Sequence, residues 1–367
     1  MRAFVQHGLP AMRFVLSVLI GALWVAPLYA NEPTPAAPLT ERQMDEITVV
    51  AGYQPGPGLW RVSKGEHEMW VLATISPLPK RMQWAADEVK TVIMESEEVI
   101  AQPSVKFEFD RGVFGMMMLV PSAMGARKNP DKETLQDQLP PALYQRWLVQ
   151  KKKFMGRDRS VEKYRPIFAA NELFDAVMDD LDLSYKAVVW PVVEKSAKKL
   201  KRTITEPVVT LKIDDTKGKL KAFKETELDD VACLESTISL LETELDVLKA
   251  RANAWATGDV DTLKTMTLNE RASSCTNAFL NSSLMKNSPL ANVQQQVAAT
   301  WLKSATTALE KNQSTLAILS LSQVLDSRNY LSALKAQGYA IEAPGESLAE
   351  PDSETEREPE TADASAP

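Results

Sequence analysis

Residues 59–76 read LWRVSKGEHEMWVLATIS. Two apolar, β-prone runs flank the Lys64-Gly65 dipeptide, which is typical of a tight turn, and so the stretch predicts a β-hairpin with strands at 59–62 and 68–75. The second strand stops abruptly at Ser76-Pro77. In α/β proteins, such strand ends commonly carry functional side chains. This strand end offers only Thr74 and Ser76, with no histidine, cysteine or carboxylate beside them.

The chain beyond the hairpin predicts a mixed α/β fold in which two similar strand–helix halves form a central sheet around a large helical insertion. The first half continues with a helix over 84–99 and a strand through Val105, Phe107 and Phe109. The last half predicts a helix from Ser288-Pro289 to about Glu310, followed by a strand at 315–321, a helix at 328–337 ended by Gly338, and an edge strand at 339–341.

The middle of the chain, residues 140–205, is charged and predicts helices. Its longest apolar stripe runs over 227–257, where a capping box at Thr226 and Asp229 predicts the start of one long helix and Gly258 its end. The Met116-Met117-Met118 run predicts core packing rather than a metal-binding methionine box.

Both ends of the chain differ from a globular domain. Arg2 and Arg13 precede an uncharged apolar run at 14–26, which predicts an exported protein with a signal peptide over 1–30 and a linker over 31–45. An uncleaved anchor is the alternative, because Leu28 is large for a cleavage site. The tail, 343–367, holds eight acidic residues and one arginine, a composition that predicts disorder. The domain itself is predicted to span 46–342.

Charge and cysteine content exclude some classes of protein. The net charge is −7, and the acidic tail alone carries that amount, so nothing predicts nucleic-acid binding; the lysine runs at 151–153 and 198–202 are typical of solvated faces. Cys233 and Cys275 are the two cysteines. In an exported protein they predict one disulfide in a periplasmic or secreted chain, with two buried thiols as the alternative.

The residues available for catalysis are few. Outside the predicted signal peptide, which holds His7, the one histidine is His67 in the hairpin turn, where exposure is expected. A zinc site built on two histidines is therefore excluded, and no glycine-rich phosphate loop is present. Carboxylates cluster at 95–98, 179–182 and 214–215, which is typical of solvated surfaces. The residues predict no metal and no cofactor.

Three stretches together resemble the TraB/GumN family, which is related to the Tiki proteases. They are LWRVSKGEHEMWVLATI at 59–75, LKARANAWATGDVDTLKTM at 248–266 and STLAILSLSQVLDSRNYLSALKAQGY at 314–339. The resemblance implies an α/β fold of two similar halves, each contributing one histidine motif to a shared site. It also implies metal-dependent peptide hydrolysis as the activity proposed for active relatives.

The sequence departs from that family where the chemistry should be. Ala73-Thr74-Ile75-Ser76 stands in place of Gly-Thr-Ile-His, and Ser320-Leu321-Ser322-Gln323 in place of Gly-Ala-Gly-His. An acidic residue expected near 102–104 is also missing, since Gln102, Pro103 and Ser104 occupy those positions. Serine and glutamine oxygens bind transition metals poorly compared with imidazole.

These departures favour a catalytically degenerate binding or regulatory protein that uses a remnant cleft lined by Thr74, Ser76, Ser320, Ser322 and Gln323. Its partner would be an unknown peptide or envelope protein, with no stable transmembrane span after signal cleavage. One alternative is a peptidase-like hydrolase with non-histidine chemistry, for example through Ser76 or a cation held by carboxylates. The other is a structural or envelope role carried by the acidic tail.

Overall fold

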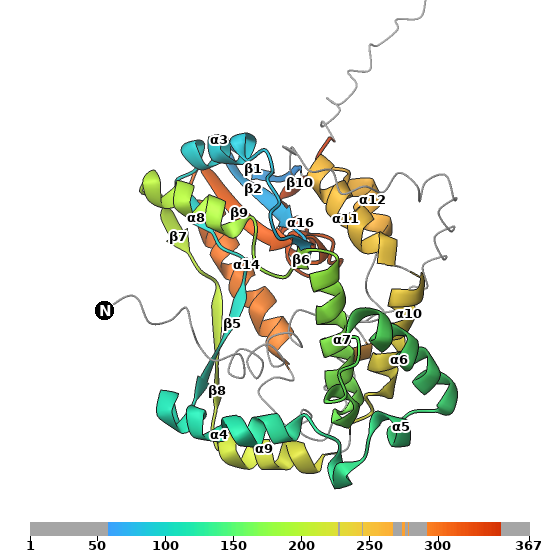
Figure 1. Ribbon diagram of the computed structural model, residues 1–367. Coiled ribbons are helices and arrows are strands. Elements are labelled where there is room, and N and C mark those ends of the chain that lie inside the picture. Colours follow the sequence, from blue (N-terminus) through green and yellow to red (C-terminus); the bar gives the residue numbers. More distant parts are fainter. Residues whose placement is uncertain are drawn as a thin grey trace, which may run out of the picture.

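The computed structural model describes residues 58–226, 228–243, 245–266, 274, 275, 278 and 292–345 (Figure 1). The predicted signal peptide and linker, the predicted helix start at Ser288-Pro289, and the tail beyond Gly345 lie outside the described residues. No helix of the described part is long and apolar enough to cross a membrane.

A six-stranded mixed sheet organises the fold, and the predicted mixed α/β class is confirmed. The strands are, in spatial order, β10 (Ala340–Glu342), β1 (Leu59–Lys64), β2 (His67–Thr74), β9 (Ser314–Ser320), β4 (Glu98–Ile100) and β7 (Thr203–Thr205). β1 runs antiparallel to β10 and β2, whereas β2, β9, β4 and β7 are parallel neighbours. The two ends of the domain therefore meet in the centre of one sheet.

The predicted hairpin is formed by β1 and β2, with Gly65 in the turn at a positive φ of 62° that a residue without Cβ adopts easily. β2 then pairs with β9 from Glu68 opposite Ser314 to Thr74 opposite Ser320. Residues 314–319 are all buried, so both faces of β9 are covered, as is typical of central parallel strands.

Helices from both halves cover this sheet. They are α3 (Asp87–Glu95), α8 (Trp190–Lys199), α14 (Val293–Lys311), α15 (Leu321–Val324) and α16 (Leu331–Ala336). α14 packs along β2, β9 and β4, and places the fully buried Trp301 in the core. α3 packs against β9 and α8.

The helical insertion has a core of its own beside the sheet. Its elements are α5 (Leu135–Gln138), α6 (Pro141–Phe154), α7 (Pro166–Asp180) and α10 (Val231–Thr243), with short 3₁₀ turns at Pro130–Lys132 and Val161–Lys163. α11 (Leu245–Thr257) begins in this core, but its Trp255 and the buried residues of α12 (Val260–Thr265) belong to the core of the sheet. Trp147, Leu173 and Leu234 are fully buried between these helices. The predicted disulfide between Cys233 and Cys275 is present.

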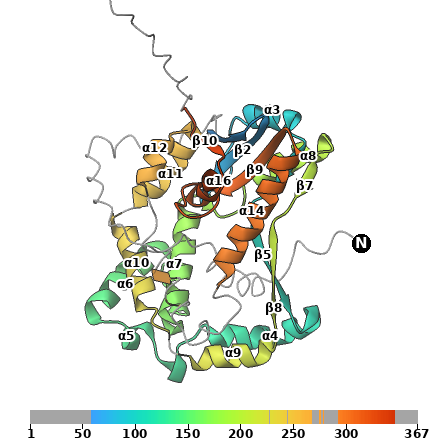
Figure 2. The same ribbon diagram turned by 180° about the vertical axis from the view of Figure 1, so that it is seen from behind.

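Two parallel strands lead away from the sheet as an arm. β5 (Ser104–Phe109) pairs with β8 (Val208–Ile213), and both strands end in helices, α4 (Gly112–Ala126) and α9 (Thr216–Glu225). Figures 1 and 2 show α4 and α9 side by side at the far end of the arm. A third small sheet joins β3 (Leu78–Pro79) to β6 (Leu183–Ser184).

Several local predictions were wrong. The helix predicted over 84–99 ends at Glu95, and Glu98–Ile100 instead forms β4 beside β9. The helix predicted to start at Thr226 begins at Val231 instead, and Thr226 ends α9. Residues 183–184 and 203–205, predicted helical, are strands. Lys151, predicted to be solvated, is buried and pairs with Glu162 at 2.6 Å.

The methionine run was also predicted wrongly, because Met117 and Met118 lie on the outside of α4 with 48% and 84% of their surface exposed. His67, predicted to be exposed, is half-buried as the first residue of β2.

Loss of the disulfide should lower the free energy of unfolding by about 4 kcal/mol, since the bond closes a loop of 42 residues and restricts the unfolded chain. Equilibrium urea unfolding with and without dithiothreitol measures this difference. The double variant Cys233→Ala/Cys275→Ala is the control, because dithiothreitol should not alter its stability. A wild-type protein whose stability is unaffected by the reductant would contradict the prediction.

Asp230 should make the stability depend on pH. Burial is the main cause that raises the pKa of its carboxyl to about 6, although the Ile167 N–H donates to it at 3.1 Å and Arg165 lies near. Between the ordinary value of 3.8 and about 6, the folded state binds more protons than the unfolded state. Stability from this group is therefore complete below pH 4 and is lost as the pH rises to about 7, by about 3 kcal/mol.

Urea unfolding of Asp230→Asn across pH 4–7 tests this, because the amide keeps an acceptor for Ile167 but does not titrate. The slope of stability against pH should flatten in this variant. The exposed neighbour Asp229 supplies the matched control, Asp229→Asn, which should keep the wild-type slope. An unchanged slope in Asp230→Asn would show that other groups carry the dependence.

Candidate functional site

Three parallel strands end together at one edge of the sheet, the position where ligands bind in open α/β sheets. Thr74, the last residue of β2, lies opposite Ser320, the last residue of β9. In β4, Ile100 lies opposite Ala317, which places Gln102 close to the same level just beyond the strand. We call the five residues predicted from sequence the strand-end site: Thr74, Ser76, Ser320, Ser322 and Gln323.

On the β9 side, the polar side chains hold the start of α15. Ser320 and Gln323 form a capping box, in which the Gln323 N–H donates to Ser320 Oγ at 3.2 Å and the Ser320 N–H donates to Gln323 Oε1 at 2.9 Å. The Ser320 and Ser322 hydroxyls lie 3.0 Å apart. Both ends of the Gln323 amide are used, because its Nε2 donates to the Tyr330 hydroxyl at 3.1 Å.

Tyr330 contacts the strand-end site through Gln323, and the sequence analysis did not identify it. It is buried against Trp301, with ring centroids 5.5 Å apart. Burial is the main cause that raises the pKa of Tyr330 to about 12, and the Gln323 hydrogen bond opposes that rise. The Tyr330 hydroxyl therefore stays neutral at physiological pH and accepts the Gln323 hydrogen bond.

On the β2 side, Thr74 is tied into the sheet and Ser76 is not. Thr74 Oγ1 donates to the Leu319 carbonyl at 3.2 Å. Ser76 is exposed, and no hydrogen bond joins it to any described residue. Trp255 of α11 packs against this end of β2, where its buried indole Nε1 donates to the Ala73 carbonyl at 3.1 Å.

Gln102 stands near the position where the resemblance leads one to expect an acidic residue. Its Nε2 is buried and has no hydrogen-bond partner within the described part of the chain. Buried amide groups are normally hydrogen-bonded, so an unpartnered donor at a strand end points to an acceptor supplied from elsewhere.

The histidine and the acidic clusters lie elsewhere. His67 begins β2, about 23 Å along the strand from its far end, and its Nδ1 lies 2.7 Å from the Asn312 carbonyl. Asp179 and Asp182 pair with Lys80, at 3.0 and 3.8 Å. Among the described residues, no group of three or more His, Cys, Asp or Glu side chains could hold a metal ion.

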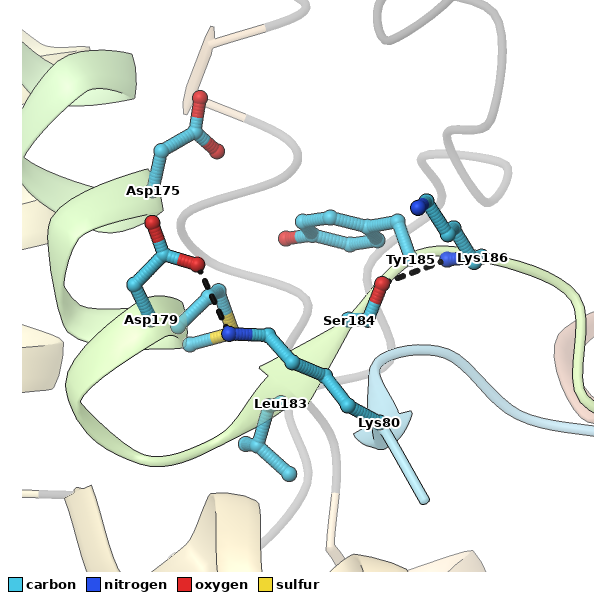
Figure 3. A pocket seen from close by; sticks show the side chains of 8 residues that line it. Lys80, Asp175, Asp179, Leu183, Ser184, Tyr185 and Lys186 are labelled. Carbon is cyan, nitrogen blue, oxygen red and sulfur yellow. Dashed lines mark hydrogen bonds and ion pairs between the residues drawn. The ribbon is translucent and has the colours of Figure 1, made fainter. Parts of the chain in front are cut away.

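A shallow pocket of about 460 Å³ lies where β3 meets β6, and β3 follows Ser76 closely in the chain (Figure 3). Its lining combines charged and apolar side chains, namely Lys80, Asp175, Met178, Asp179, Leu183, Ser184, Tyr185 and Lys186. Figure 3 shows the Lys80 ammonium directed to Asp179, which leaves the Tyr185 ring and Lys186 on the other side of the pocket. None of these residues belongs to the strand-end site, and of them the sequence analysis named only Asp179, as part of the carboxylate cluster at 179–182.

The model of the TraB/PrgY/gumN family matches residues 58–343. The chain belongs to this family. No curated protein and no solved structure matches it. The family segment at 248–266 has a structural role in this chain, since Gly258 ends α11 at a φ of 73° and Asp259 caps α12 by accepting from the Thr262 N–H at 3.0 Å.

Substitution of Gln323 by alanine should destabilise this family member by about 1–3 kcal/mol, because the Ser320 N–H and the Tyr330 hydroxyl both lose a partner. Loss of the amide should also raise the pKa of Tyr330 further, since that hydrogen bond lowers it. Urea unfolding and ultraviolet titration of tyrosine measure the two effects.

Gln323→Glu is the matched variant. A carboxylate keeps the acceptor for Ser320 and can accept a hydrogen bond from the Tyr330 hydroxyl, so this variant should keep most of the stability that Gln323→Ala loses. If alanine at 323 were neutral in both measurements, the capping role of Gln323 would be wrong.

Proposed function

We propose that this chain is an exported TraB/PrgY/gumN-family protein that has lost the family's implied metal chemistry and acts as a binding or regulatory protein through the strand-end site. The resemblance places histidines at the positions of Ser76 and Gln323. The residues present do not fit a transition metal, because neutral hydroxyl and amide oxygens are poor ligands for it.

The hydrogen bonds of Gln323 carry this proposal. Its Oε1 already accepts from Ser320 and its Nε2 donates to Tyr330, so the side chain serves the fold rather than an incoming ion. A metal ligand needs a free lone pair directed at the metal and a neighbouring group that holds the ligand in that orientation. The amide oxygen keeps a second lone pair, but a neutral amide oxygen is a weak ligand for a transition metal, and the hydrogen bonds to Ser320 and Tyr330 already fix its direction.

The remaining polar groups suit a ligand that is recognised by hydrogen bonds. Ser76 and Ser322 expose hydroxyls that both donate and accept, and Gln102 supplies a buried donor. A peptide backbone presents the complementary carbonyl and N–H groups. We therefore place an extended peptide, or a segment of an envelope protein, at this edge of the sheet.

The alternative, a hydrolase with altered chemistry, requires a general base within hydrogen-bond reach of Ser76. Within the described residues, no histidine or carboxylate is hydrogen-bonded to Ser76, and His67 is engaged at the other end of β2. Asp326, beyond β9, uses its carboxylate to accept from the Arg328 and Asn329 N–H groups. The geometry thus favours binding over hydrolysis.

Export is part of the same proposal. It comprises a signal peptide over 1–30, a linker over 31–45, the domain over 46–342, a disordered acidic tail over 343–367, and a periplasmic or secreted location. The disulfide between Cys233 and Cys275 supports it, because such bonds persist in oxidising compartments.

Metal content of the purified chain, with thermal-shift titrations of Mn²⁺, Co²⁺, Zn²⁺ and Ca²⁺, tests the loss of metal chemistry. We expect no stoichiometric ion and no shift, whereas an ion at 100 times its dissociation constant would stabilise the fold by about 2.7 kcal/mol. Any peptidase activity in the preparation should be the same in Ser76→Ala. A bound ion, or an activity lost in Ser76→Ala, would favour the hydrolase.

Site-specific photo-crosslinking in cells tests the binding role. A benzophenone amino acid at Ser76 or Ser322 should yield a discrete crosslinked species, because both side chains are exposed at the strand-end site. The control position is Glu88, which is exposed on α3. Crosslinks that are equal at all three positions, or absent from both serines, would contradict a partner at this site.

A further inference from the structure

The helix α4, at the end of the β5–β8 arm, has an unusual composition. Its 15 residues, GVFGMMMLVPSAMGA, include no charged side chain. Four exposed apolar residues follow one another at helical spacing, and we call them the apolar stripe: Phe114, Met117, Met118 and Pro121. Phe114 and Met118 expose 85% and 84% of their surface.

The apolar stripe is not the packing face of α4. The side of the helix that packs inward carries Leu119, Ala123 and Ala126, which are buried. A helix that is apolar all round normally lies in a core or in contact with lipid. At about 22 Å, α4 is too short to span the roughly 30 Å of a bilayer interior, so a lipid contact would have to lie along the surface.

Basic side chains border the apolar stripe. The neighbouring α9, with the sequence TKGKLKAFKE, carries four exposed lysines, Lys217, Lys219, Lys221 and Lys224, against one glutamate. The Lys224 ammonium lies beside Gly125, near the end of α4. Exposed Arg111 and Lys128 flank the two ends of the helix.

This local positive charge contrasts with the net charge of −7 for the whole chain. Apolar side chains bordered by lysines are typical of helices that lie in the interface of an anionic membrane. The starts of α4 and α9 carry exposed carboxylates, Asp110, Asp214 and Asp215, so the excess positive charge lies along α9. A second copy of the chain is a poorer occupant of this surface, because it would bring the four lysines of its own α9 against these four.

Among the described residues, the α4–α9 tip lies at the end of the arm, away from the six-stranded sheet. Figures 1 and 2 show α4 and α9 side by side at one extremity of the molecule, with the six-stranded sheet toward the other. A flat surface can therefore approach the tip without meeting the sheet or the helices that cover it.

We infer that the α4–α9 tip docks the protein onto an anionic lipid surface, with the apolar stripe among the acyl chains and the lysines of α9 at the headgroups. Docking by the tip would leave the strand-end site on the body of the protein, free for a partner. The inference does not depend on what that site binds.

An environment-sensitive dye on Met118→Cys in the full chain tests this inference. With vesicles that contain phosphatidylglycerol, the nitrobenzoxadiazole emission should shift to the blue and rise severalfold. The same dye on Glu88→Cys, on α3, should show neither change, which separates insertion of α4 from attachment by any other part of the chain. Vesicles of phosphatidylcholine alone should give a much smaller response at 118.

The triple variant Lys217→Gln/Lys221→Gln/Lys224→Gln should weaken vesicle partitioning of the chain labelled at 118 about a hundredfold, at about fivefold for each lysine near an anionic surface. Raising the salt from 0.05 to 0.5 M should weaken the wild type but change the variant much less. The circular dichroism of both chains should match, which excludes misfolding.

Two results would overturn the inference. One is a dye at 118 that does not respond to anionic vesicles. The other is a concentration-dependent dimer in light scattering that is lost in Met118→Ser, together with no vesicle response, because this would make the apolar stripe an interface between copies of the chain.

Discussion

The parallel pairing of β2 with β9 is the constraint on which the rest of the structure depends. It joins residues 245 positions apart, as in the hydrogen bond from Thr74 to Leu319, and it makes β9 the central strand of the sheet. Without this pairing, the edge of β2 that faces away from β1 would have no hydrogen-bonding partner, and β4 would have none on the β9 side. The helical insertion and the arm both lie in the chain between these two strands, so their folds begin and end at this pair.

The sequence predicts the elements of this pair well, because β2 and β9 are apolar runs bounded by turn residues. It predicts β4 wrongly, because three residues are too few to show the alternation of apolar and polar side chains that is typical of a strand. Glu98–Ile100 forms a strand through its pairing with β9. The strand-end residues come from the family resemblance, but the second hydrogen bond of Gln323 requires Tyr330, seven residues away, to turn back toward it. A positive φ at Tyr330 brings about that turn, and no local pattern signals it.

The exposed methionines show a different limit of sequence reasoning. An apolar run predicts burial on average, because the hydrophobic effect drives such side chains out of water. Burial inside the fold and burial against an external surface leave the same pattern in the sequence. Only the position of α4 at the end of an arm, with its Leu119 face already packed, separates the two.

The capping box also bears on how the strand-end site could have diverged. A histidine at 323 would need one ring nitrogen for a metal and the other for an orienting partner, which leaves none for the second bond that Gln323 now makes to the fold. Glutamine at this position stabilises the β9–α15 corner through two partners, Ser320 and Tyr330, at once. With glutamine in place, a serine rather than a glycine at 320 becomes favourable, because its hydroxyl completes the capping box. The two departures from the family pattern on the β9 side therefore support each other, and a return to histidine at 323 alone would weaken the corner that holds it.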